Sequence, residues 1–155
     1  RSEVLMNHSD WTEAELELRT LLKKNPQHAM ALVHLGTCLI AMSKSEQAER
    51  PLNKAIQIDP KLSEAWYQRG LLYLDFGKAD EALSDFEGAA KADSRHIDAS
   101  LRIAAILHEG GDSEKAIGAW RRVLDIDPQH DLARRRLAEC RENSAIQGKT
   151  VHPKD

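Results

Sequence analysis

Apolar and small residues return along this chain with two periods, a helical one and a longer one of 34 residues. Trp66, Gly70 and Tyr73 follow the i, i+4, i+7 spacing that marks one face of an α-helix, and the same spacing resumes after a break. Four sets of residues recur at the 34-residue step: Ala14, Ala48, Ala82 and Ala116; Gly36, Gly70, Ala104 and Ala138; Leu18, Leu52, Phe86 and Trp120; Leu5, Leu39, Tyr73 and Leu107. We therefore expect two helices in every period and an all-α fold.

Glycine and proline mark the ends of the expected helices. Gly77 and the pair Gly110-Gly111 can adopt the left-handed conformation that ends a helix, and Ser43 holds the same place in an earlier period. Asp59-Pro60 and Asp127-Pro128 mark the second break, because proline lacks the backbone donor that a continuing helix needs.

The small residues recur where two helices must cross closely. Only Gly or Ala lets helix backbones approach to roughly 8–10 Å, while the larger apolar residues fill the space on either side. One helical hairpin cannot bury its apolar stripe alone, so neighbouring hairpins stack. The pattern therefore predicts a solenoid with a concave and a convex face.

The segment 65–89, AWYQRGLLYLDFGKADEALSDFEGA, resembles a tetratricopeptide repeat in its order of Trp, Leu-Gly, Tyr, Ala and Phe. The resemblance implies a right-handed α-solenoid of antiparallel helix hairpins, a tetratricopeptide-like superhelix. It predicts a single solenoid over residues 1–146, followed by a flexible tail over residues 147–155. The expected parts are a partial repeat 1–28, repeats 29–62, 63–96 and 97–130, and a capping helix 131–146. Three residues depart from the family pattern: Arg69, Ser94 and Ser100.

In this family the first helix of each repeat lines a concave groove that binds a partner helix or an extended peptide. Carried onto this chain, the resemblance implies a peptide-binding set made of Val33, Thr37, Ile40, Tyr67, Leu71, Leu74, Leu101, Arg102 and His108. Such an apolar groove is costly to expose unless it binds an apolar ligand. The alternative interpretation is that some of these residues pack between helices.

Some co-chaperones of the family hold the C-terminal carboxylate of a heat-shock chaperone with Lys, Asn and Arg side chains. Here Val33 and Thr37 stand where Lys and Asn are needed, and Gln68 replaces the second Asn. Asp98 replaces the last Lys and opposes a carboxylate electrostatically, so only Arg102 agrees. The sequence does not support this clamp, although Arg102 could accept a single acidic side chain.

The charge and the chemistry-bearing residues favour a protein partner. The net charge of -3 lacks the basic excess that a nucleic-acid surface needs, and no apolar run is long enough to insert into a membrane. His28, His96 and His130 occupy the same turn, but successive repeats lie too far apart for a shared metal, which favours polar turn residues. Without a phosphate loop or an activated nucleophile, we expect no catalytic residue, metal site or cofactor.

Localisation stays open. Cys38 and Cys140 are too isolated to suggest a disulfide framework and favour a reducing, cytoplasmic compartment. The chain begins with Arg1, so its start says nothing about a signal or an anchor in a precursor.

We therefore expect a non-catalytic scaffold that binds a helix or an extended peptide. Two alternatives are a recruiting or regulatory domain of a larger enzyme, and a self-assembling structural protein. The second would form a homo-oligomer through the N-terminal stacking face, where Leu5, Trp11 and Leu18 lack a neighbour in the sequence pattern.

Overall fold

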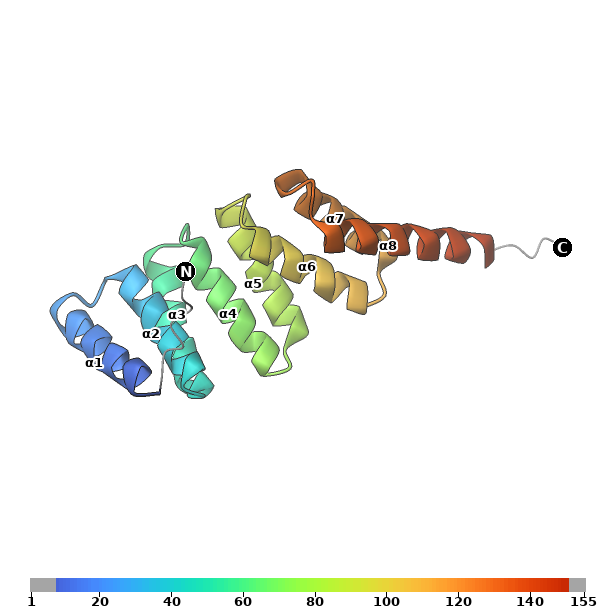
Figure 1. Cartoon of the computed structure of the whole chain (residues 1–155). Coiled ribbons are helices and arrows are strands. Elements are labelled where there is room, and N and C mark those ends of the chain that lie inside the picture. The colour runs from blue at the N-terminus through green and yellow to red at the C-terminus, as the bar shows by residue number, and fades with distance from the viewer. Residues whose placement is uncertain (1–7, 151–155) are drawn as a thin grey trace. The chain divides into compact units, whose positions relative to one another are not determined.

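The computed structural model describes residues 8–150, and every regular element in that range is an α-helix (Figure 1). The helices are α1 (His8–Lys24), α2 (Ala29–Ala41), α3 (Ser45–Ile58), α4 (Ser63–Asp75), α5 (Ala79–Ala92), α6 (Ile97–Glu109), α7 (Ser113–Ile126) and α8 (Asp131–Thr150). Leu5, which belongs to one of the expected apolar columns, lies outside the described residues. The expected all-α fold is confirmed.

The 34-residue period of the sequence is also the period of the helices. The first helices α2, α4 and α6 begin at Ala29, Ser63 and Ile97, and α8 follows at Asp131 with the same step. The second helices α3, α5 and α7 begin at Ser45, Ala79 and Ser113. Each repeat is therefore a hairpin of one first helix and one second helix, and α1 is a second helix.

The chain divides into two compact units, Arg1–Asp93 and Ser94–Asp155. In the first unit α2 packs on α1, α3 and α4, and α4 packs on α5. In the second unit α7 packs on both α6 and α8. The single solenoid over residues 1–146 stays a prediction, and α8 runs to Thr150, past the expected end of the capping helix.

The core of the first unit forms where a large side chain of a second helix meets a glycine of a first helix. Leu52 and Phe86 have no exposed surface. A Cβ atom on Gly36 would lie 2.7 Å from Leu52 Cγ, and one on Gly70 would lie 2.7 Å from Phe86 Cε1. The glycines are therefore required because the large side chains lie directly against the helix backbone.

The turns inside the hairpins share one backbone conformation. Ser43, Gly77 and Gly111 all have positive φ, of 58°, 71° and 78°. The Lys44 backbone N–H donates to the carbonyl of Leu39 at 2.8 Å, which closes the end of α2. The expected break at Ser43 is confirmed, although a non-glycine residue in this conformation is strained.

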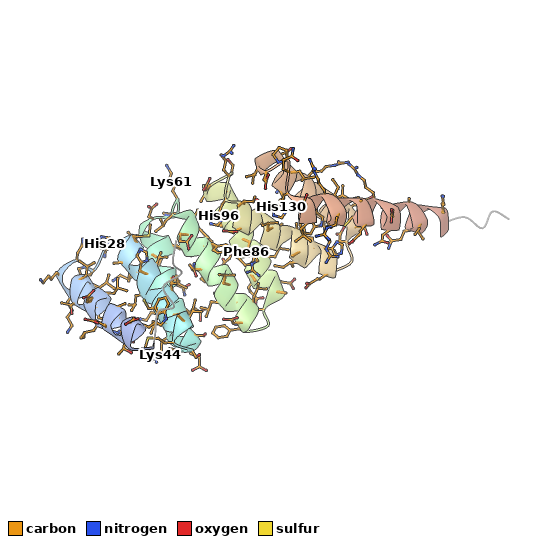
Figure 2. All side chains as sticks on the ribbon, viewed as in Figure 1. His28, Lys44, Lys61, Phe86, His96 and His130 are labelled. Atoms are coloured by element: carbon orange, nitrogen blue, oxygen red, sulfur yellow. The ribbon has the colours of Figure 1, made fainter. Side chains whose placement is uncertain are left out.

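Histidine caps the helices that follow the turns between repeats. Nδ1 of His28 and of His96 accepts the backbone N–H three residues later, both at 3.1 Å, and His130 does so at 3.3 Å (Figure 2). Leu62 holds the equivalent place before α4 and offers no side-chain acceptor. The periodic histidines therefore have a local role, since each satisfies a backbone donor that a helix N-terminus leaves unpaired.

The glycine at the helix crossing gives a stability test. We expect Gly70→Val to lower the free energy of unfolding by about 1–3 kcal/mol, because the new side chain overlaps the buried Phe86 ring. Gly118→Val is the matched control, since a Cβ atom at this helical glycine meets nothing within 4 Å. Urea unfolding of both variants measures the difference. Equal losses would show that the crossing tolerates a larger residue.

Candidate functional site

In the first unit, most of the expected peptide-binding residues lie half-buried on two first helices. Thr37 and Ile40 are on α2, whereas Tyr67, Leu71 and Leu74 are on α4, which packs against α2. The three α4 residues follow i, i+4, i+7 spacing and so share one helix face. α4 therefore presents a continuous apolar row that is only partly covered.

Val33 differs from its neighbours in this set because it is only 1% exposed and belongs to the core of the first unit. Its carbonyl accepts a hydrogen bond from the Thr37 hydroxyl at 3.1 Å. Val33 therefore has almost no exposed surface for a ligand, and the interpretation that some of these residues pack between helices applies to it.

The Tyr67 ring rests on the buried ring of Phe86, with centroids 5.6 Å apart and an interplanar angle of 51°. This tilted arrangement is favourable for aromatic pairs and restricts the movement of the Tyr67 ring. A ring that is already positioned loses less conformational entropy when a ligand binds.

A buried ion pair lies in the same hairpin. Arg69 donates from Nε and Nη2 to the two carboxylate oxygens of Asp85, each at 2.7 Å, and from Nη1 to Asn53 Oδ1 at 2.8 Å. The hydrogen bonds with the Asp85 carboxylate raise the pKa of the Arg69 guanidinium. The guanidinium carbon also lies 5.3 Å from the ring centroid of Trp66 and 5.6 Å from that of Tyr73.

The sequence singled out Arg69 only as a departure from the family pattern and gave Asp85 no role. The sequence did contain a signal for this pair: a cation such as Arg69, directly beside a glycine at a helix crossing, needs an anion on the facing helix. Asp85 is 3% exposed, which confirms that its charge must be compensated inside the protein.

In the second unit, α6 carries the remaining expected residues. Leu101 is half-buried and Arg102 is exposed. His108 is half-buried, and its Nδ1 lies 3.1 Å from Cys140 Sγ on α8. Its ring also makes a T-shaped contact with the Trp120 ring, with centroids 6.3 Å apart.

The contact between His108 and Cys140 was missed because these residues are far apart in the sequence. Burial raises the pKa of the Cys140 thiol, which disfavours the thiolate that a nucleophile or a metal ligand needs. Within residues 8–150, no three or more His, Cys, Asp or Glu side chains are grouped as a metal site would require. No helix in that range is long and apolar enough to cross a membrane.

Comparison with known proteins identifies the repeat. Two family models, both described as tetratricopeptide repeat, match residues 5–71 and 67–131. A search of curated proteins gave no match.

Three solved structures illustrate the likeness. The crystal structure of MamA has a TM-score of 0.77 and 21% identity, covering 92% of this chain and 84% of that one. YrrB, described as a TPR protein with an unusual peptide-binding site, has a TM-score of 0.66 and 28% identity over 79% of this chain and 63% of that one. The first TPR of Spaghetti (RPAP3), bound to the HSP90 peptide SRMEEVD, has a TM-score of 0.65 and 24% identity over 77% of this chain and 97% of that one.

The described helices thus pack as sequential hairpins that match tetratricopeptide superhelix structures.

The contribution of the ion pair to stability can be tested by replacing its two residues with the equivalent residues of the next repeat. Ile103 and Ala119 hold the positions of Arg69 and Asp85 one period later. Arg69→Ile leaves the Asp85 carboxylate buried without its cation, so we expect the free energy of unfolding to fall by about 2–4 kcal/mol. The loss is smaller than for a deeply buried pair because the Arg69 side chain is 18% exposed.

The double variant Arg69→Ile, Asp85→Ala should recover most of that loss, because neither charge remains buried. Urea unfolding at neutral pH provides the comparison. The account would be contradicted if the double variant lost as much unfolding free energy as the single variants Arg69→Ile and Asp85→Ala lose together.

Proposed function

Because this chain belongs to the tetratricopeptide repeat family, we propose that it is a non-catalytic scaffold that binds a helix or an extended peptide of another protein. Domains of this family generally mediate protein or peptide binding and are usually non-catalytic. Two of the similar structures support the proposal, since one is described by its peptide-binding site and another contains a bound peptide.

The observation that carries the proposal is the apolar row of Tyr67, Leu71 and Leu74 on α4. The i, i+4, i+7 spacing places these three side chains on one face of α4, along which the apolar anchors of an amphipathic ligand helix can pack. Ile40 on α2 is half-buried and extends the apolar character of this surface, and Thr37 adds a hydroxyl. Leu101, Arg102 and His108 are the corresponding contacts that we propose for the second unit.

Tyr67 is the residue that we expect to contribute most to the binding. Aromatic side chains held by packing dominate many protein interfaces, and truncating one often costs about 2 kcal/mol or more. The contact with Phe86 holds the Tyr67 ring in place before a ligand arrives. The tyrosine can therefore act as a preorganised anchor.

The proposed ligand is apolar rather than an acidic C-terminus. A clamp for a terminal carboxylate needs several cations or amides, and Val33 is buried where the first cation would stand. Asp98 is exposed on α6 in the second unit, where its charge opposes a carboxylate. The similarity to the structure with the peptide SRMEEVD therefore does not transfer its ligand to this chain.

Selection from a displayed peptide library tests the proposal. We expect the native chain to enrich peptides with apolar residues at helical or alternate spacing. Leu71→Asp should weaken the binding of these peptides at least about tenfold, because it places a charge in the centre of the apolar row. Fluorescence anisotropy with a labelled peptide measures the change in Kd.

Leu16→Asp is the matched control, because Leu16 is 67% exposed on α1 and lies outside the proposed surface. Circular dichroism must show that both variants keep their helices, and Leu71→Ala serves where the aspartate unfolds the chain. Equal affinity of the native chain and the folded Leu71 variant would rule out α4 as the binding surface.

A further inference from the structure

A groove of the first unit lies between the second helices α1 and α3. The first helix α2 packs on both of them and forms the floor of the groove. The volume of this α1–α3 groove is about 480 Å³, and it shares no residue with the apolar row of α4. Its lining residues are Arg19, Leu32, Leu35, Leu39, Glu46, Gln47, Arg50, Pro51 and Lys54.

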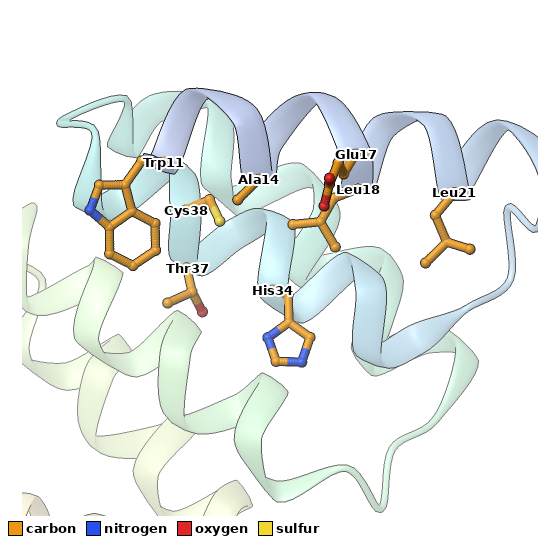
Figure 3. Close-up of a pocket in the computed structure, with 8 residues that line it drawn as sticks. All are labelled: Trp11, Ala14, Glu17, Leu18, Leu21, His34, Thr37 and Cys38. Atoms are coloured by element: carbon orange, nitrogen blue, oxygen red, sulfur yellow. The ribbon is translucent and has the colours of Figure 1, made fainter. Parts of the chain in front are cut away.

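A different groove of the same unit lies between α1 and α2, with Leu18 and Leu21 in its lining (Figure 3). The 34-residue step puts the first helix of the partial first repeat at that place, before His8 and outside the described residues. We therefore assign no other ligand to it. The α1–α3 groove shares none of its lining residues, and both of its walls and its floor already belong to described helices.

The walls of the α1–α3 groove carry an excess of positive charge. Arg19, Arg50 and Lys54 line it, and Glu46 offsets only one of these charges. Arg19 already donates to the Glu15 carboxylate at 2.9 Å. Arg50 and Lys54 form no ion pair with any other residue that the structure describes. Because residues four apart share a helix face, these two cations repel each other until an anion binds.

The repeat itself does not require the two cations. Ser84 holds the place of Arg50 in the next repeat. Gly88 holds the place of Lys54 there, and the hairpin of α4 and α5 forms without either charge. Arg50 is exposed, so its guanidinium has no part in the core and is available to a ligand.

Pro51 adds a hydrogen-bond acceptor to the same wall. Because proline has no backbone N–H, the carbonyl of Gln47 lacks the donor that a helix supplies four residues later. Both residues line the groove. An extended peptide has backbone N–H groups free to donate to this carbonyl, whereas a helical ligand uses most of its own internally. The acceptor therefore favours an extended ligand.

The spacing of the two free cations sets the spacing of the ligand's acidic residues. Four residues along a helix span about 6 Å, and two residues of an extended chain span about 6.6 Å. Asp or Glu residues two apart in an extended peptide can therefore reach Arg50 and Lys54 together. The residue between them points to the opposite side, where an apolar side chain can contact the floor at Leu32 and Leu35.

We propose that the α1–α3 groove binds an extended acidic segment of a partner protein, in which one apolar residue stands between two Asp or Glu residues. The carboxylates pair with Arg50 and Lys54, and a backbone N–H of the segment donates to the Gln47 carbonyl. A nucleic acid fits less well, because the net charge of the chain is -3. The site goes beyond the α4 surface and selects its ligand by charge rather than by apolar contact alone.

A labelled peptide Gly-Glu-Leu-Glu-Gly with blocked ends is the probe, and fluorescence anisotropy measures its Kd. We expect saturable binding to the native chain. Arg50→Glu should weaken this binding at least about tenfold, and a peptide with Lys in place of both Glu residues should bind the variant better than the native chain. Lys91→Glu is the matched control, since it makes the same charge change at an exposed residue of α5 outside the groove lining.

Pro51→Ala tests the contact with the backbone. Ala119 holds this place two repeats later, so the helix accepts the change. The new N–H pairs with the Gln47 carbonyl, so we expect Tm to rise while the Kd of the peptide rises at least about threefold. A higher Tm with an unchanged Kd would overturn the extended binding mode.

Three further results would overturn the proposal: no saturable binding, equal weakening by Arg50→Glu and Lys91→Glu, or equal affinity for a peptide with Ser in place of Leu. The last result would show that charge alone attracts the peptide. Circular dichroism must show that the variants keep their helices, and Arg50→Ser serves where the glutamate unfolds the chain. Leu71→Asp should leave this Kd unchanged, which separates this test from that of the proposed function.

Discussion

The close crossing between the two helices of each hairpin is the constraint on which the rest of the structure depends. A large side chain of the second helix occupies the space that a side chain of the first helix would need, as Phe86 does at Gly70. The residue at the crossing must therefore be small: an added methyl group has no room at Gly36 or Gly70, and the next period has Ala104 at the same position. This requirement sets the orientation of both helices, and so decides which residues of α4 remain partly open to a ligand.

Outside the crossing, the same backbone accepts very different chemistry. The third period joins its two helices with the charged pair Arg69 and Asp85, while the fourth has Ile103 and Ala119 at these positions. A buried ion pair gives little net stability over an apolar pair, because desolvation offsets most of its attraction. It does restrict which helices fit together, since a lone charge at either position is costly.

The sequence predicted the helices well because their determinants are local and repeated. The 34-residue step located the helix starts, and Gly77 with Gly111 located the turns. The sequence predicted the binding site less well, since helical spacing defines a helix face only to within about one residue. For this reason Val33 was assigned to the groove although it is buried. The contact between His108 and Cys140 joins two different helices, so it could be found only once their packing was known.

The partial burial of the α4 row also limits the kind of binding that it can support. Tyr67, Leu71 and Leu74 already lose much of their water contact in the free chain, so a ligand removes only the remaining apolar area. At about 25 cal/mol per Å², that remainder yields a modest gain before the cost of ordering the ligand is subtracted. High affinity therefore requires several repeats to act together or a ligand that is already helical.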